Sequence, residues 1–151
     1  MKIQQLAVFL QNKPGHLSGI CKTLADNGVN IITLSLADTQ QFGILRLIVK
    51  EWKLAAQKLE EAGYLVQIRE VVAVEVEDRP GGMYDILEII GDAGVNIEYV
   101  YAFTFHKSDR AVLVFRFDDP DKAIEALKAA GRNALGDIDI FEQAGAAACS
   151  N

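Results

Sequence analysis

Cysteine is scarce in this sequence, and long apolar runs are missing. The two cysteines, Cys21 and Cys149, form neither a disulfide framework nor a paired metal-binding motif, which is typical of a reducing compartment. No apolar run approaches the roughly 20 residues that a membrane-spanning helix needs, and the first residues form a strand pattern rather than a cleavable leader. We therefore expect a cytoplasmic protein without a membrane partner.

Positive charge is also in short supply. The 151 residues include 15 Lys and Arg against 21 Asp and Glu, which gives a net charge of -6 and a pI near 4.9. A protein that binds phosphate backbones needs clustered basic residues, so we expect no nucleic-acid partner. Hydrophobic residues make up 50% of the chain and charged residues 24%, a balance that favours a folded core.

Arrangements typical of a catalytic or metal site are not evident either. The two histidines, His16 and His106, have no neighbours at the spacing of a catalytic triad or a zinc site. The acidic stretches at 50–61 and 118–123 are typical of solvated helix faces rather than of paired catalytic carboxylates. The sequence therefore predicts no enzyme activity, no metal and no cofactor.

What the chain does contain is an internal repeat. Residues 12–31 read NKPGHLSGICKTLADNGVNI and residues 78–97 read DRPGGMYDILEIIGDAGVNI, with identical residues at eight of the twenty positions. Ordinary composition would give roughly one or two identities by chance. The strand patterns on both sides repeat as well, with a two-residue slip at a hairpin tip. We infer that the chain contains two copies of one folding unit.

Each copy predicts the order strand, helix, strand, strand, helix, strand. Apolar residues alternate along 6–10 and 72–76, as in half-buried strands. A helix is predicted from about 15 to 27, with an equivalent helix ending at Gly94. This order predicts an α+β fold of two ferredoxin-like βαββαβ sandwiches, each an antiparallel four-stranded sheet with two helices on one face. The apolar helix stripes are Leu17, Ile20, Cys21 and Leu24 in the first copy, and Met83, Ile86, Leu87 and Ile90 in the second.

The repeat also predicts the domain limits. We expect a first domain at 1–69, a second at 70–143 and a flexible tail at 144–151, with no Gly, Pro or Ser linker between the domains. The last strand is predicted in DIDIF, residues 137–141. At least two of the alternating aromatics after Asn96 are expected in the core, and these are Tyr99, Tyr101, Phe103 and Phe105.

The repeated motif resembles that of the ACT domain, a small-molecule sensing module found beside many enzymes of amino-acid metabolism. The resemblance rests on the Asn/Asp-x-Pro-Gly turn after the first strand, the helix that the turn opens, and the Gly-Val-Asn-Ile that follows. It covers nearly the whole chain, twice. It implies a free-standing tandem ACT protein, a non-enzymatic regulator that binds a free amino acid or related small metabolite where the turn of one domain faces a neighbouring domain.

Physical chemistry supports binding at such a turn. A helix N-terminus has unpaired amides and a partial positive charge, so the amides of Gly15, His16 and Leu17 could receive a carboxylate. The resemblance adds the side-chain amides of Asn12 and Asn30. Serine sensors of the family carry a histidine where this chain has Leu10, so serine specificity does not carry over.

The second turn keeps the same positions with different chemistry. Asp78 stands where the first copy has Asn12, and its carboxylate would repel a ligand carboxylate but could accept an ammonium group. We therefore rank the first turn above the second as a ligand site. The second copy is either degenerate or supplies the opposite wall, and its candidate residues are Asp78, Gly81, Gly82, Met83 and Asn96.

Two other functions compete with the sensor. One is a ligand-independent regulatory subunit or assembly module, which pairs with itself as a homodimer through edge strands or with an amino-acid biosynthetic enzyme. The other is an acylphosphatase-like hydrolase that uses Arg79 with Asn96. The acidic neighbours Glu77, Asp78 and Asp85 disfavour the hydrolase, because they weaken an anion cradle.

Overall fold

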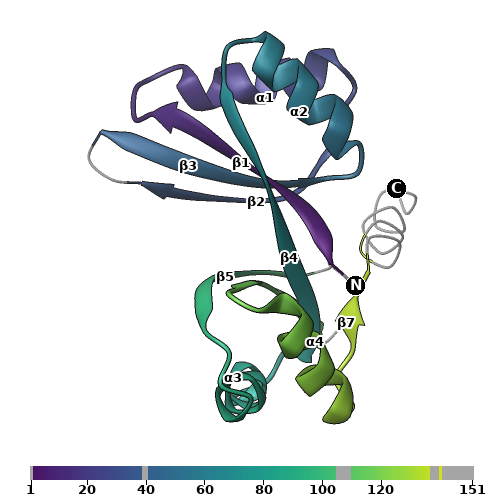
Figure 1. Ribbon diagram of the computed structural model, residues 1–151. Coiled ribbons are helices and arrows are strands. Elements are labelled where there is room, and N and C mark those ends of the chain that lie inside the picture. Colours follow the sequence, from purple (N-terminus) through teal and green to yellow (C-terminus); the bar gives the residue numbers. More distant parts are fainter. Residues whose placement is uncertain (1, 39–40, 105–109, 137–139, 141–151) are drawn as a thin grey trace. The chain divides into compact units, whose positions relative to one another are not determined.

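The structure is a computed structural model that describes residues 2–38, 41–104, 110–136 and 140 (Figure 1). The chain divides into two compact units. We call Gln4–Arg69 the N-terminal unit, and Glu70–Asn151 together with Met1–Ile3 the C-terminal unit. The expected tail at 144–151 lies outside the described residues. None of the helices in the described part of the chain is long and apolar enough to cross a membrane.

The N-terminal unit is a four-stranded sheet with both of its helices on one face (Figure 1). The strand order is β2-β3-β1-β4, and β3 pairs antiparallel with both β1 and β2. The strand β4 also continues into the C-terminal unit. In chain order the elements are β1 (Ile3–Gln11), α1 (His16–Asp26), β2 (Ile31–Asp38), β3 (Phe42–Val49), α2 (Trp52–Glu61) and β4 (Leu65–Glu77).

The core of the N-terminal unit follows from strand alternation and helix period. Leu6 and Val8 on β1 pair with Leu47 and Leu45 on β3, so the four side chains share one face of the sheet. The helices cover this face with one apolar stripe each. The buried helix residues are Ile20 and Leu24 on α1, and Ala55, Ala56 and Leu59 on α2.

The C-terminal unit repeats this arrangement and confirms the predicted fold class. Its strand order is β5-β6-β4-β7, and β6 pairs antiparallel with both β4 and β5. The Phe115 and Phe117 rings stack in its core with centroids 5.2 Å apart, where the first copy has Leu47 and Val49. Its further elements are α3 (Gly82–Asp92), β5 (Ile97–Thr104), β6 (Arg110–Phe117), α4 (Pro120–Ala129) and β7 (Ala134–Leu135).

Lys2 forms two ion pairs within the C-terminal unit. The ammonium group of Lys2 lies 2.9 Å from a carboxylate oxygen of Asp121 and 3.3 Å from one of Glu70. The hydrogen bond to Asp121 is the main reason that the pKa of Lys2 is raised. These ion pairs connect Lys2, which precedes β1, to α4 and to the middle of β4.

The last strand differs from the prediction. The fourth strand of the C-terminal unit is β7 at Ala134–Leu135, paired with Val74 and Ala73 of β4. Of the predicted strand DIDIF only Ile140 is described, and its N–H donates to the Gly136 carbonyl four residues earlier, as in a helical turn. The short strand therefore starts just after the turn that ends α4, before the apolar alternation that suggested DIDIF.

The aromatic residues of β5 lie away from the helix-covered core. Tyr99, Tyr101 and Phe103 are half-buried and pair with Arg116, Val114 and Val112, on the face opposite to the core residues Leu113 and Phe115. The expectation that at least two aromatics belong to the core therefore does not hold for the core beneath α3 and α4. Phe105 lies outside the described residues.

Both apolar helix stripes begin one turn later than predicted. Leu17 and Met83 are exposed, with exposed fractions of 36% and 40%. They precede Ile20 and Ile86, the first large apolar residues of each helix that are buried on the sheet. The same overhanging position is thus apolar and exposed in both units, next to the Pro-Gly turn.

Candidate functional site

The two Pro-Gly turns have the same backbone conformation. Gly15 has φ 88° and ψ -19°, and Gly81 has φ 88° and ψ -14°, both in the left-handed region. The amide of Lys13 donates to the Gln11 carbonyl at 2.8 Å, and that of Arg79 donates to the Glu77 carbonyl at 2.9 Å. Glycine is needed at the left-handed position because a Cβ there would crowd the backbone.

The start of α1 has no internal cap. Gly15 provides no side chain, and the first turn of α1 carries no acidic residue. Within the described part of the chain, the amides of Leu17 and Ser18 have no hydrogen-bond acceptor. The amide of His16, predicted as a ligand donor, instead donates to the Lys13 carbonyl at 3.3 Å. The unpaired amides and the helix dipole therefore favour an anionic group beside Leu17 and Ser18.

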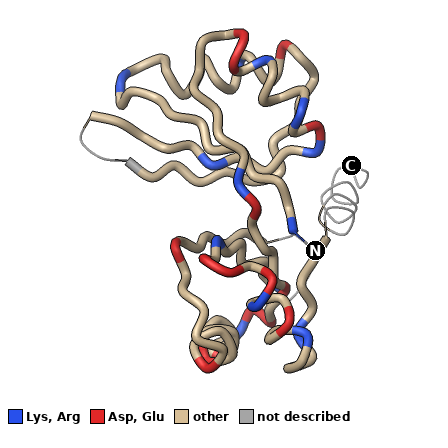
Figure 2. The backbone as a smooth tube through the Cα atoms, in the orientation of Figure 1, with Lys and Arg blue, Asp and Glu red and all other residues tan. Residues whose placement is uncertain are grey.

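The charge around the two turns is opposite in sign. Residues 11–26 contain two lysines and one acid, Asp26, which pairs with Lys22. Residues 77–92 contain five acids and a single arginine, Arg79 (Figure 2). An anionic ligand is therefore attracted to the first turn and repelled from the second.

The second turn is crossed by an ion-pair network. The guanidinium group of Arg79 donates to Glu77 at 2.7 Å, to Asp85 at 2.6 Å and to the Pro80 carbonyl at 3.2 Å. Arg132 adds a contact of 3.6 Å to the same Asp85 carboxylate. The hydrogen bond from Arg79 lowers the pKa of Glu77, and the hydrogen bonds to Glu77 and Asp85 raise the pKa of Arg79.

The backbone of the second turn is also packed more closely. Gly82 is buried, and a Cβ at this position would collide with the Glu77 carbonyl oxygen. The equivalent residue of the first turn is His16, which is half-buried and carries a full side chain. Gly82 is therefore required by close packing, a role that the Pro-Gly pattern alone did not reveal.

The two predicted asparagines of the N-terminal unit lie at opposite ends of its sheet. Asn12 follows Gln11, which pairs with Phe42 at the start of β3, whereas Asn30 precedes Ile31, which pairs with Val49 at the end of β3. The seven-residue separation along β3 corresponds to about 23 Å. Both asparagines are exposed, so a small ligand cannot contact both within one unit.

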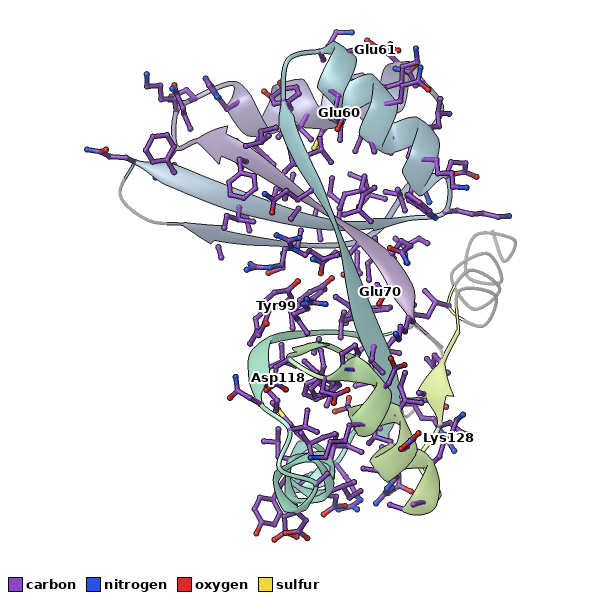
Figure 3. All side chains as sticks on the ribbon, in the orientation of Figure 1. Glu60, Glu61, Glu70, Tyr99, Asp118 and Lys128 are labelled. Carbon is purple, nitrogen blue, oxygen red and sulfur yellow. The ribbon has the colours of Figure 1, made fainter. Side chains whose placement is uncertain are left out.

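The C-terminal unit separates its candidate residues in the same way. Asp78 lies beside the Glu77–Arg110 pair and Asn96 beside the Ile97–Phe117 pair, at opposite ends of β6. The backbone amide of Asn96 donates to the carboxylate of Asp118 at 3.0 Å, and the backbone carbonyl of Asn96 accepts from the Asp118 amide at 3.2 Å. Asp118 is labelled in Figure 3. This backbone pairing gives Asn96 a structural role at the start of β5.

The same separation argues against the hydrolase hypothesis. Arg79 and Asn96 are the two groups that an acylphosphatase-like site would need together, and the unit places them at opposite ends of β6. Arg79 is also engaged by two carboxylates. Among the described residues, no group of three His, Cys, Asp or Glu side chains is placed to hold a metal ion.

Two βαββαβ units, each with a left-handed glycine before its first helix, define a tandem of ferredoxin-like domains. A family model for an ACT domain pair matches residues 1–142, and the chain belongs to this family. The resemblance deduced from the two Pro-Gly turns is therefore confirmed.

Several solved structures share the fold. Protein BT0572 from Bacteroides thetaiotaomicron is 34% identical, with a TM-score of 0.88 over 94% of this chain and 97% of that chain. The ligand-free regulatory subunit of aspartate kinase from Thermus thermophilus is 18% identical, with a TM-score of 0.61 over 85% and 92%. Aspartate kinase from Synechocystis is 22% identical, with a TM-score of 0.60 over 90% of this chain and 27% of that chain. No curated protein matches the sequence.

Proposed function

We propose that this protein is a non-enzymatic regulator that binds a free amino acid or related small metabolite at the first turn. The observation that carries the proposal is the uncapped start of α1, where the amides of Leu17 and Ser18 have no acceptor among the described residues. Unlike α3, whose first turn contains Asp85, α1 has no acidic residue in its first turn. A ligand carboxylate would accept from these amides, and the exposed side chain of Asn12 would contact the rest of the ligand.

A second chain completes the site in this proposal. Because Asn12 and Asn30 lie at opposite ends of one sheet, Asn30 of a neighbouring ACT domain would form the other wall. Among the described strands, β2, which starts at Ile31, lies at an edge of its sheet, and an edge strand can pair with a strand of a homodimer partner. Ligand binding would then stabilise one arrangement of the domains and limit or release an amino-acid biosynthetic enzyme. The fold shared with a regulatory subunit of aspartate kinase supports this type of partner.

A thermal-shift screen tests the proposal. The twenty amino acids and their keto-acid precursors are added at about 10 mM, and a ligand at one hundred times its Kd adds about 2.7 kcal/mol to the free energy of unfolding. We expect Asn12→Ala and Asn30→Ala each to weaken binding about tenfold, since each removes a hydrogen-bonding side chain. Asn133→Ala, an exposed asparagine outside both turns, is the control. A screen in which no compound raises the melting temperature contradicts the proposal.

The assembly module is the second candidate. Leu34 and Leu36 on the edge strand β2 are exposed by 45% and 44%, and an apolar edge favours pairing with another strand. Light scattering separates the two candidates. A dimer that forms equally with and without amino acids, together with an absence of thermal shifts, favours the assembly module over the regulator.

A further inference from the structure

Arg79 connects three consecutive pieces of the second turn. Its guanidinium group reaches Glu77 at the end of β4, the Pro80 carbonyl within the turn and Asp85 on α3. The planar fork of arginine can donate in these several directions at once, which a lysine ammonium on a flexible stem does less well. The equivalent residues of the first turn are Gln11, Lys13 and Gly19, which offer no carboxylate to bridge.

The two turns also differ in the residue that contacts them from the end of the second helix of each unit. Arg132 and Tyr64 both follow a left-handed glycine, and their amides donate to the equivalent carbonyls of Leu127 and Leu59 at 2.8 and 3.0 Å. Arg132 contacts the carboxylate of Asp85. Tyr64 places its hydroxyl where a Cβ of Gly19, the equivalent of Asp85, would lie. One contact position is thus ionic in the C-terminal unit and uncharged in the N-terminal unit.

The backbone supports the same distinction independently of charge. The Glu77 carbonyl lies against buried Gly82, and the Gly82 amide donates to the Arg79 carbonyl at 3.0 Å. At the first turn the equivalent bond, from His16 to Lys13, is longer at 3.3 Å, whereas the bonds on either side of it differ by only 0.1 Å between the turns. Side-chain bridging and close backbone packing therefore act on the same short segment.

We propose that the Arg79 network holds the second turn closed, so that each chain has one ligand-responsive turn and one structural turn. Closure would be a property of the free protein, because among the described residues the ion pairs of Arg79 and Arg132 are made within the C-terminal unit itself. The part of this inference that concerns ligand rests on the proposed function, whereas closure is measurable without any ligand.

Amide hydrogen exchange of the free, full-length chain tests closure. Protection factors are compared between the two turns at three pairs of equivalent hydrogen-bonded amides. In each pair we expect the amide of the C-terminal unit to have the higher protection factor. In Arg79→Lys, which introduces the residue type of the first turn, we expect protection at Gly82 and Asp85 to fall about fivefold. Lys22→Ala, which removes an exposed ion pair on α1, is the matched control and leaves these values unchanged. The amide pairs are Arg79 with Lys13, Gly82 with His16, and Asp85 with Gly19.

An NMR titration tests which of the two turns responds to a ligand. A mixture of the twenty amino acids at about 1 mM each is added, and amide shifts are followed at 15–19 and 81–85. Shifts confined to 15–19 support the proposal. Shifts at 81–85 in the wild type overturn it, as do equal protection factors at the two turns or unchanged protection in Arg79→Lys. If neither turn shifts, the proposed function is contradicted, and the exchange data still decide whether the second turn is closed.

Discussion

The two turns of this protein have the same backbone and different chemistry. Gly15 and Gly81 share one left-handed conformation, and each precedes a helix that packs on an equivalent sheet. Among the described residues, neither helix start has a side-chain cap. The turns differ in charge, because residues near the first turn are mainly positive, whereas Arg79 at the second turn is surrounded by carboxylates. The comparison shows that the Pro-Gly pair is accompanied by the same backbone conformation in both units, while the side chains beside it set a different local charge.

The cores of the two units offer a similar comparison. Positions of β3 and β6 that face the helices are equivalent, yet Leu47 and Val49 in one unit correspond to Phe115 and Phe117 in the other. Both sets are fully buried. The sandwich therefore accepts side chains of different volume as long as the alternation along the strand is kept.

Truncation of the aromatic core should give the largest effect. We expect Phe115→Ala to lower the free energy of unfolding by about 3–5 kcal/mol, because it removes a buried, stacked ring and leaves a cavity. Leu47→Ala, its counterpart in the N-terminal unit, should cost about 2–5 kcal/mol. Urea denaturation measures both changes. A loss below about 1 kcal/mol for Phe115→Ala would show that the two cores are not equivalent.

A methyl group at the second turn should have an intermediate effect. We expect Gly82→Ala to destabilise the protein by about 1–3 kcal/mol, because its Cβ collides with the Glu77 carbonyl oxygen. His16→Ala, at the equivalent position of the first turn, should change stability by no more than about 0.5 kcal/mol. Urea midpoints of the two variants measure this difference. Equal effects would remove the packing difference between the turns.

The pH dependence of one exposed acid should give the smallest effect. Arg79 lowers the pKa of Glu77 in the folded protein, so the ionised form is favoured by folding. This contribution is present above the ordinary value of 4.5 and is lost as the pH falls through the lower folded pKa. Glu77→Gln, which introduces the residue type of Gln11, should therefore lower the melting temperature at pH 7 and match the wild type in strong acid.

A double-mutant comparison identifies the cause. If Arg79 is responsible, Glu77→Gln should have less effect at pH 7 in an Arg79→Lys background than in the wild type. Melting curves at pH 7 and at acid pH measure both differences. An equal effect in the two backgrounds would mean that Glu77 stabilises the protein through other groups, and the charge contrast between the two turns would lose part of its basis.

Much of the fold could be predicted because the same pattern of strands and helices occurs twice in the sequence. The period of α1 and the alternation of β1 are strong signals in both copies, and Gly28 and Gly94 end equivalent helices. The short strand β7 was not predicted, because a strand of two residues has no period and depends on pairing with β4. Of the strand predicted at 137–141 only Ile140 is described. The aromatic residues of β5 were misassigned because alternation does not say which face of a sheet the helices cover.

The candidate site was predictable only as a set of residues. Asn12, Asn30 and the turn glycines stay predicted ligand residues, and the sequence could not show that the two asparagines lie at opposite ends of β3. It also could not show that the His16 amide is already paired.

The sequence by itself determined the duplication, the sandwich order and the position of both turns, because these depend on local periodicity and on the backbone freedom of glycine. Only the tertiary structure decided that the two turns differ in their side-chain contacts. Arg79 and Asp85 are neighbours along the chain, whereas Arg132 is remote in sequence. Arg132 meets Asp85 because α3 and the end of α4 pack on the same sheet. Their charges compensate one another only in that arrangement, since ion pairs depend on distance in space.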